Sequence, residues 1–387
     1  MEIIIFLIPI ITIVILAWKF RKQTAWWEYL VVAVPSLLLF VGLKYSFVYI
    51  SSLDTEYLSD LVSNVTYYEP WDEIVMVTHT RTVPCGKGRT RTITYTVPER
   101  RYHPAEYIYE TIHGDKESVS KETYQYICKK LNTQPVFKDM HRRYHLKDGD
   151  AYITYWNKTR EHSYPVTWEH SYQNKIKASS YSIFKYSNIS EEDAKKEGLY
   201  EYPEIKLYDQ NPIIGYNAKE SDIDAVRYLN GYRGPKNQIH VLICCYNTSN
   251  MEISEMQKAY WQGGNKNEFI VCLGIKNNKV IWCNPFSWSD KPILEVKTRD
   301  YFINHPNVNF KEYAEWLDSQ ISKNWVRKQF DDFNYINIEL STGWYIVILI
   351  IILLYNIGIS YWVITNNYTE NDPTGHKSYK SHYYNRW

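Results

Sequence analysis

The sequence predicts an α+β membrane protein in which three transmembrane helices flank an extracytoplasmic β-hairpin and meander region and an α/β sandwich module. Three observations support this fold class: three long apolar runs, an unequal distribution of charge around them, and a change from period-two alternation to alternating helices and strands near residue 190. The predicted organisation is a transmembrane helical hairpin (1–50), a β-rich region (51–190), an α/β module (191–341), a transmembrane helix (342–365) and a cytoplasmic tail (366–387).

The apolar run over residues 26–50 sets the predicted topology. It is long enough to cross a bilayer, which takes about 20 helical residues. Its amino-terminal flank is basic and its far flank is acidic. The flanking residues are Lys19, Arg21, Lys22, Asp54, Glu56 and Asp60. Because basic residues beside a span stay on the cytoplasmic side, this segment is expected to run outward.

Two further apolar runs, residues 3–18 and 344–364, complete the predicted membrane part. The first is followed by basic residues instead of being preceded by them, which favours a retained span over a cleaved signal peptide. The third has acidic residues before it and basic residues after it. We therefore expect the N-terminus and residues 51–341 to be extracytoplasmic, and the polar tail to be cytoplasmic and disordered.

Composition narrows the class of partner. The chain carries 44 basic and 43 acidic residues, so its net charge of +1 gives no electrostatic case for nucleic acid. It also contains 37 Tyr and 14 Trp. Such residues suit β-sheets and interfaces, because their rings bury area while a polar group stays satisfied. Two interpretations stay open, a β-rich fold and a recognition surface.

Alternation predicts two β structures in the first outer region. Residues 74–83 and 89–97 alternate between polar and apolar side chains around the turn PCGKG, which predicts a hairpin. Asp148-Gly149 is a type I′ turn signal, and Asn157-Lys158 offers another tight turn. Residues 142–168 are therefore predicted to form a three-stranded meander.

The second outer region follows a different pattern. Helical segments are predicted at 191–198, 222–232, 252–261 and 309–330, a buried strand at 238–246, and a hairpin at 268–284. This order predicts helices packed on a mixed sheet.

Three segments of this module precede a helix and a carboxyl-terminal span. They are QIHVLICCY, EISEMQKAYWQ and NEFIVCLGIKNNKVIWCNPF. In this order, residues 221–333 resemble the TPM domain of membrane-tethered extracytoplasmic proteins. The resemblance implies an acidic metal-binding cluster near the strand ends and, for some members, phosphatase activity. Asn247, Glu252 and Glu255 stand at this place, without a dense group of aspartates. Most of the chain also resembles predicted membrane proteins of tailed phages, a likeness that implies a phage origin and no activity.

Histidines raise the question of a zinc site. The four candidates are His141, His145, His162 and His170. The predicted turns place His145 opposite Tyr152 and His162 opposite Ile153, so the two point to opposite faces of the sheet. No HExxH, GxSxG or Walker motif is present, and Lys87 lies in a glycine-rich turn with the wrong spacing for a phosphate loop. We assign no catalytic residue, metal ligand or cofactor-binding residue, and predict no cofactor.

All six cysteines lie in the outer segment. An extracytoplasmic location favours disulfides, and Cys85 and Cys128 are a possible pair. A two-residue turn at Asn277-Asn278 predicts Cys272 opposite Cys283. Cys244 and Cys245 point to opposite sides of their strand and are predicted to be core thiols. For Cys85, a nucleophile assisted by His79 or His103 is the alternative to a turn cysteine, which is the favoured interpretation.

These observations predict a non-enzymatic, membrane-tethered binding or assembly protein at the envelope of a phage host. Its expected partners are the lipid bilayer and a protein partner or further copies in the envelope, and no nucleic acid. One alternative is a membrane-anchored, metal-dependent hydrolase of phosphatase type, with its site near the strand ends at Tyr246 and Asn284. Another is a subunit of a larger membrane complex, with Asn356 and Gly358 in helix packing.

Overall fold

The computed structural model describes residues 1–86, 90–142, 145–179, 182, 186–205 and 210–366. The chain forms two compact units. The first, the membrane unit, consists of Met1–Asp54, Ser171–Lys185 and Phe330–Trp387, and the second, the sheet unit, of Thr55–His170 and Tyr186–Gln329. Residues 87–89, which include Lys87 of the predicted turn, and the predicted tail from residue 367 onward lie outside the described residues.

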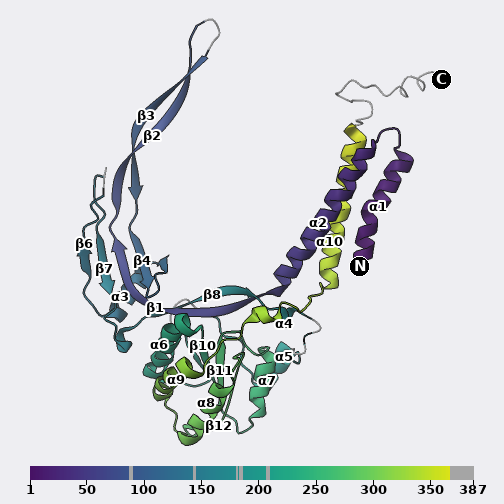
Figure 1. The fold of residues 1–387 in the computed structure, drawn as a ribbon. Helices are drawn as coiled ribbons and strands as arrows, with labels where there is room; N and C mark the ends of the chain where they lie inside the picture. Colours follow the sequence, from purple (N-terminus) through teal and green to yellow (C-terminus); the bar gives the residue numbers. More distant parts are fainter. Residues whose placement is uncertain (87–89, 143–144, 180–181, 183–185, 206–209, 367–387) are drawn as a thin grey trace, which may run out of the picture. The chain divides into compact units, whose positions relative to one another are not determined.

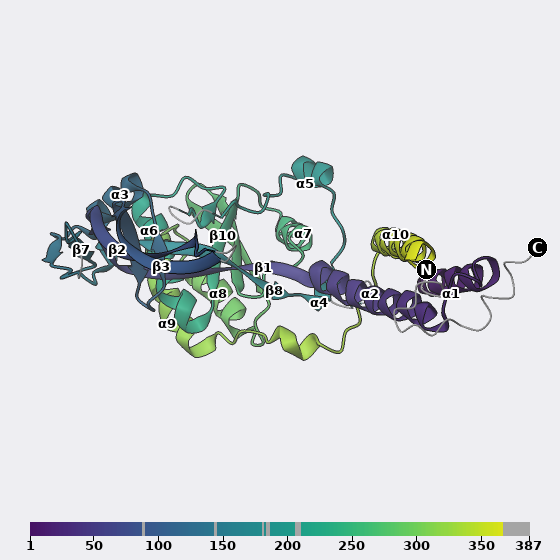
Figure 2. The same ribbon diagram turned by 90° about the horizontal axis from the view of Figure 1, so that it is seen from above.

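Three apolar helices dominate the membrane unit. They are α1 (Glu2–Lys19), α2 (Trp26–Ser52) and α10 (Thr342–Asn366), and each is long and apolar enough to cross a membrane. They lie side by side in both views (Figures 1 and 2). The short helix α4 (Lys175–Ala178) and the 3-10 turn η2 (Phe330–Phe333) belong to the same unit. The structure thus confirms the three apolar helices predicted from the sequence.

A polar contact joins two of these helices. Asn356 of α10 is buried and donates from Nδ2 to Ser36 Oγ of α2 at 3.0 Å and to the Ile352 carbonyl at 2.8 Å. Asn356 is therefore a packing residue within this bundle. Gly358 is different, because a Cβ built at this position would meet nothing within 4 Å.

A six-stranded antiparallel sheet forms the first part of the sheet unit. Its elements are β1 (Leu53–Tyr68), β4 (Glu106–Thr111), β5 (Lys116–Ser118), β6 (Val136–Lys138), β7 (Ala151–Tyr155) and β8 (Pro165–Gln173), with the helix α3 (Lys121–Leu131). The strand order is β5-β4-β1-β7-β6, and β8 also pairs with β1. Ile127 and Leu131 of α3 share a buried cluster with Val62 and Val65 of β1.

The predicted meander over 142–168 is wrong. β7 pairs with β1 and with β6, with Val136 opposite Ile153, and residues 139–142 and 145–150 belong to no described strand. The 3-10 turn η1 (Arg160–His162) follows, and β8 returns to β1 instead of β7. The reason is β1: it has buried apolar residues to cover, and long-range pairing with it overrides the local turn signals.

A four-stranded mixed sheet forms the second part of the sheet unit. Its order is β12-β11-β10-β9, from β12 (Lys279–Ser287), β11 (Glu268–Lys276), β10 (His240–Tyr246) and β9 (Ile213–Ile214). The helices are α5 (Glu191–Glu197), α6 (Glu220–Asn237), α7 (Glu252–Tyr260), α8 (Ile293–Asn304) and α9 (Phe310–Asn324). The predicted strand at 238–246 and the helices near 191, 222 and 252 are confirmed; α9 ends earlier than predicted, and α8 was not predicted.

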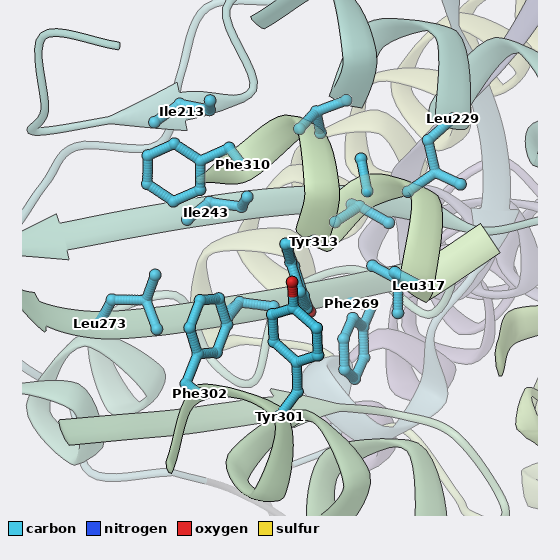
Figure 3. Packing of buried hydrophobic residues seen from close by; sticks show 14 of the residues in the cluster. Ile213, Leu229, Ile243, Phe269, Leu273, Tyr301, Phe302, Phe310, Tyr313 and Leu317 are labelled. Carbon is cyan, nitrogen blue, oxygen red and sulfur yellow. The ribbon is translucent and has the colours of Figure 1, made fainter. Parts of the chain in front are cut away.

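The core of this module lies between its sheet and its helices. Phe310, Tyr313 and Leu317 of α9 point toward Ile243, Phe269 and Leu273 of the sheet, with Tyr301 and Phe302 of α8 beside them (Figure 3). The opposite face of the sheet buries Leu242 and Cys244 against Trp261 and partly buried Tyr200 and Ile253. Strands covered on both faces show continuous apolar runs, which is why β10 lacks alternation.

The register of β11 and β12 differs from the prediction by one residue. Cys272 lies opposite Asn284, and Leu273 lies opposite Cys283, because the register shifts between Gly274 and Ile275. The turn itself is as expected, with positive φ at both Asn277 and Asn278. A Cβ at Gly274 would lie 2.0 Å from Trp282 Nε1. At this register shift the Trp282 indole therefore packs against the backbone of residue 274, where only glycine leaves room for it.

Candidate functional site

The candidate functional site is a two-stranded ribbon, β2 (Trp71–Pro84) with β3 (Thr90–His103) (Figure 1). The strands pair from Trp71 opposite His103 to Pro84 opposite Thr90 without a shift in register. Among the described residues no third strand joins either one. Every residue of β3 from Thr90 to Tyr102 is exposed. The structure confirms the predicted hairpin and makes it longer than the alternation indicated.

The two faces of the ribbon differ in chemistry. One, the threonine face, carries three cross-strand pairs, Thr78–Thr96, Thr80–Thr94 and Thr82–Thr92. The other, the valine face, carries aliphatic and aromatic side chains with basic residues between them. Its members include Val75, Val77, His79, Arg81, Val83, Arg91, Ile93, Tyr95 and Val97. Ile93 and Tyr95 are 44% and 47% exposed, so the valine face presents apolar surface to solvent.

Aromatic stacking and ion pairs fix the base of the ribbon. Trp71 stacks on His103 with ring centroids 4.1 Å apart, and the Arg142 guanidinium lies 4.0 Å from the Trp71 ring. Gly149 packs so closely there that a Cβ would lie 2.6 Å from Trp71 Cβ. Its positive φ of 59° also suits glycine, so the predicted turn residue serves to hold Trp71.

Charged residues complete this base. Arg100 donates to Asp72 at 2.6 Å, and this contact lowers the pKa of the Asp72 carboxyl. His103 Nε2 lies 3.0 Å from Glu73 Oε1, and Arg101 lies 3.9 Å from the same oxygen. The base is therefore held by side chains, whereas farther along the ribbon the strands depend chiefly on each other.

Backbone hydrogen bonds show which groups face the outer edges. Leu146 N donates to the Asp72 carbonyl at 2.8 Å, and His145 forms a bridge with Glu73. The Asp72 carbonyl thus points away from β3. Because backbone groups alternate in direction along a strand, the even-numbered residues of both strands direct their backbone groups outward. Pro98 occupies such an outward position, where its missing N–H costs the ribbon no hydrogen bond.

A second polar cluster lies at Glu56, on β1. Its side chain is 1% exposed, and Arg327 Nη2 donates to both carboxylate oxygens, at 2.8 and 2.7 Å. His170 Nδ1 lies 2.9 Å from Oε1, and Lys266 Nζ lies 3.5 Å from it. The chain passes from one unit to the other after residues 54, 170 and 329, among other points. The cluster residues Glu56, His170 and Arg327 lie within a few residues of these three points. We assign the cluster a structural role, holding those segments together.

A third polar group surrounds His240, the first residue of β10. This side chain is 1% exposed, and neither ring nitrogen has a hydrogen-bond partner among the described residues. Glu268 Oε1 is 3.8 Å from Nδ1, beyond hydrogen-bond distance, and burial lowers the pKa of His240 to about 4. The adjoining cavity, of about 20 Å³, is lined by Asn230 and Arg227 among others, and has room for about one water-sized molecule.

The structure separates the other predicted histidines. His141 lies beside Asp139, His145 contacts Asp148, and His162 ends η1. The registers from which we argued are wrong, since the structure places His145 and His162, which we predicted on paired strands, outside its named strands: His145 forms an isolated β-bridge with Glu73, and His162 lies in η1. Among the described residues, the group of three donor side chains close enough for one metal is Asp139, Asp148 and Asp150, which contains no histidine.

Cysteines are free thiols in the structure. Cys85 is exposed at the end of the ribbon, whereas Cys128 lies on α3 with Sγ 3.5 Å from Thr154 Oγ1, so the structure does not contain the suggested Cys85–Cys128 disulfide. Cys244, Cys245 and Cys272 are buried, and burial raises the pKa of the Cys245 thiol. His79 pairs with Glu99 at 3.1 Å and His103 with Glu73, so both imidazoles named as candidate bases for Cys85 contact carboxylates.

The predicted strand-end location brings some expected residues together. Asn284 Nδ2 donates to Glu255 Oε1 at 2.7 Å and to Ser254 Oγ at 2.8 Å, while Arg299 donates to Asn284 Oδ1 at 2.8 Å. Glu252 instead accepts from its neighbour Asn250. Glu255 is thus engaged by an amide, and no described group of three metal donors includes it.

Sequence reasoning missed Glu56, Arg327 and the aspartate group. Glu56 was interpreted only as a charge flanking a span, and no local pattern connects it to Arg327, which is hundreds of residues away. The signal that existed for the aspartates was KDGD, interpreted as a turn. In comparisons with protein-family models, curated proteins and solved structures, no match to this chain was found.

Proposed function

We propose that this chain is a membrane-tethered, extracytoplasmic binding or assembly protein, with the β2–β3 ribbon as its contact surface. The charges flanking the three apolar helices support the orientation, since basic residues concentrate on the side assigned to the cytoplasm. The resemblance to phage membrane proteins extends the proposal to action at a host envelope. Residues 221–333 resemble a TPM domain, and their mixed sheet with helices on both faces is in keeping with that resemblance. In this proposal the module is the folded scaffold, and the ribbon is the contact surface.

The observation that carries the proposal is the exposure of the ribbon on both faces. An isolated two-stranded hairpin is marginally stable in water, and three or more strands or a packed layer are needed for independent stability. The ribbon gains no such layer from the described residues, yet it presents Val77, Ile93 and Tyr95 on one face. Exposed apolar surface of this kind is typical of a protein contact site.

Orientation is tested with Cys85, the exposed thiol at the end of the ribbon. Spheroplasts expressing the full chain are treated with a membrane-impermeant maleimide, with Cys85→Ser as the matched control. We expect labelling that depends on Cys85, because the remaining described thiols are buried or half-buried. Labelling only after the membrane is opened would place the ribbon in the cytoplasm and contradict the proposal.

Binding is tested with a photo-crosslinking residue at Val77 of the ribbon, and with the same residue at exposed Lys276 as a matched control. We expect the probe at position 77 to join the chain to a discrete protein in membranes, and the probe at 276 to give no such product. Absence of any protein adduct from the ribbon would refute a binding role for it.

A metal-dependent hydrolase is the second candidate. The observation in its favour is the proximity of Asp139, Asp148 and Asp150, whose carboxylates lie within 4.8 Å of one another. Metal analysis of the purified full chain, with Asp148→Asn as the control, decides between the two. Stoichiometric metal that is lost in the variant would support the hydrolase, whereas a metal-free chain would favour the binding protein.

A further inference from the structure

The free edge of β3 has a self-complementary sequence. Its outward backbone groups belong to the even-numbered residues, and among the described residues only β2 pairs with this strand. Along the valine face, Arg91 and Ile93 stand before Tyr95, and Val97 and Glu99 stand after it. Around Tyr95 the residues are thus arranged symmetrically. If the strand is paired with a reversed copy of itself, a basic residue faces an acidic one and an apolar residue faces an apolar one.

From this we infer that the ribbon's partner is a second copy of this chain, with the two β3 edges paired antiparallel around a two-fold axis at Tyr95. In this register Arg91 lies opposite Glu99 of the other copy, Ile93 opposite Val97, and Tyr95 opposite itself. The result is a four-stranded sheet, β2-β3-β3-β2. It exceeds the three strands that an independently stable sheet needs, whereas a lone hairpin has only two. The inference rests on the proposed function, because it names the partner of the same ribbon.

Charges favour this register over the one with its axis at Thr96. A shift of the axis from Tyr95 to Thr96 would place Arg91 opposite Arg101, and like charges directly opposite each other are destabilising. With the axis at Tyr95, Arg91 would form an ion pair with the Glu99 carboxylate of the other copy. Within its own chain this carboxylate contacts His79 through Oε1. Arg91 itself forms no ion pair within the described part of the chain.

The other edge of the ribbon suits this pairing less well. The base of β2 is already covered by His145 and Leu146. Beyond this base, β2 carries Arg81 and no carboxylate, so its self-pairing would bring no opposite charges together. Pro98 does interrupt the β3 edge. Its carbonyl still accepts from Thr92 of the other copy, so each Pro98 removes one hydrogen bond and leaves the rest of the ladder.

Cysteine crosslinking tests the register directly. In a Cys85→Ser background, Tyr95→Cys is placed in the full chain in detergent and oxidised. Because the outward backbone groups belong to the even-numbered residues, Tyr95 would lie opposite itself at a non-hydrogen-bonded position, where Cα atoms are about 4.5 Å apart, within the range of a disulfide. We expect a covalent dimer. Val97→Cys is the matched control, because two copies of residue 97 would be four positions apart along the strand, about 14 Å, and should not react.

A mixture adds an independent readout. Chains with Ile93→Cys alone and with Val97→Cys alone should each give no covalent dimer after oxidation, but their mixture should give a covalent heterodimer. Reaction of Val97→Cys with itself as readily as Tyr95→Cys would show random collision and overturn the inference. Failure of Tyr95→Cys to react would overturn it as well.

Charge reversal checks the pairing without cysteines. Arg91→Glu and Glu99→Arg should each weaken self-association in sedimentation by about tenfold, because two symmetric pairs are lost. The double variant should restore it, since the charges are merely exchanged; an unrestored double variant would contradict the register. If the ribbon crosslinks to a different protein but not to itself, the inference fails and the proposed function stands. If it crosslinks to nothing, both fail.

Discussion

The sheet β9–β12 and the ribbon β2–β3 are both built from paired strands with high β propensity, yet they meet solvent in opposite ways. Every residue of β10 is buried, and Figure 3 shows side chains from α8 and α9 closing over the sheet. Every residue of β3 except His103 is exposed. Pairing alone therefore does not decide whether a strand belongs to a core; the layer that covers it does.

This difference separates stability from recognition. The sheet β9–β12 buries apolar side chains on both faces, so substitutions there remove buried area and leave cavities. The ribbon has little buried area to lose, so substitutions there change what it contacts. Variants in the two regions are expected to sort into these two classes, and the following experiments test that separation.

The largest effect is expected in the core. Phe269 lies on β11 with no exposed surface, and Phe269→Ala should lower the free energy of unfolding by about 3–5 kcal/mol. The matched ribbon variant Ile93→Ala should change it by less than about 0.5 kcal/mol, because Ile93 is 44% exposed. Urea unfolding of the full chain in mild detergent, followed by tryptophan fluorescence, measures both. Equal losses would mean that the ribbon is part of the cooperative core.

The Glu56 cluster is expected to come next. Arg327→Leu leaves a buried carboxylate with only Lys266 and His170 beside it, and should cost about 3 kcal/mol of unfolding free energy. The double variant Glu56→Leu with Arg327→Leu should recover most of this loss, because the buried carboxylate that lost Arg327 is removed as well. A double variant as unstable as the single one would assign Arg327 a packing role instead of an ionic one.

How far the sequence predicted the structure depended on whether the relevant contacts were local. The three apolar helices, the β2–β3 hairpin and the buried strand β10 follow from runs and periods within single segments, and all are present. The meander failed because Asp148-Gly149 is a local signal, whereas β1 competes for β7 from far away in the chain. The one-residue register error at Cys272 came from the irregularity at Gly274, which depends on the position of Trp282.

The candidate site shows the same limit. Alternation located the ribbon, but not its isolation from every other described strand, because exposure depends on what the rest of the chain covers. Glu56 and Arg327 illustrate the opposite case. Each appears in the sequence as an ordinary charged residue, and their pairing becomes visible only when β1 and the segment after α9 are brought together.

A smaller, pH-dependent effect is expected at His240. Burial lowers its pKa in the folded state to about 4, below the unfolded value near 6.5, so the unfolded chain takes up a proton first as the pH falls. Stability is therefore full near pH 7 and is lost through this window. By pH 5 the loss should be about 2 kcal/mol, judged against a His240→Gln variant that lacks it. Parallel stability curves for the two proteins would show that His240 is not buried as a neutral group.

The smallest effect on stability, and the sharpest contrast, is expected on the valine face. Tyr95→Ser should change the free energy of unfolding by less than about 1 kcal/mol, because Tyr95 is 47% exposed and loses only its stacking on His79, yet it should remove aromatic contact area from the paired ribbons. Sedimentation of the full chain should therefore show weaker self-association, while urea unfolding at a concentration where the chain is monomeric changes little. Thr80→Ser on the threonine face is the matched control, and should alter neither measurement. If Tyr95→Ser instead destabilised the monomer as strongly as Phe269→Ala, the tyrosine would belong to a core, and the separation between a folding sheet and a binding ribbon would fail.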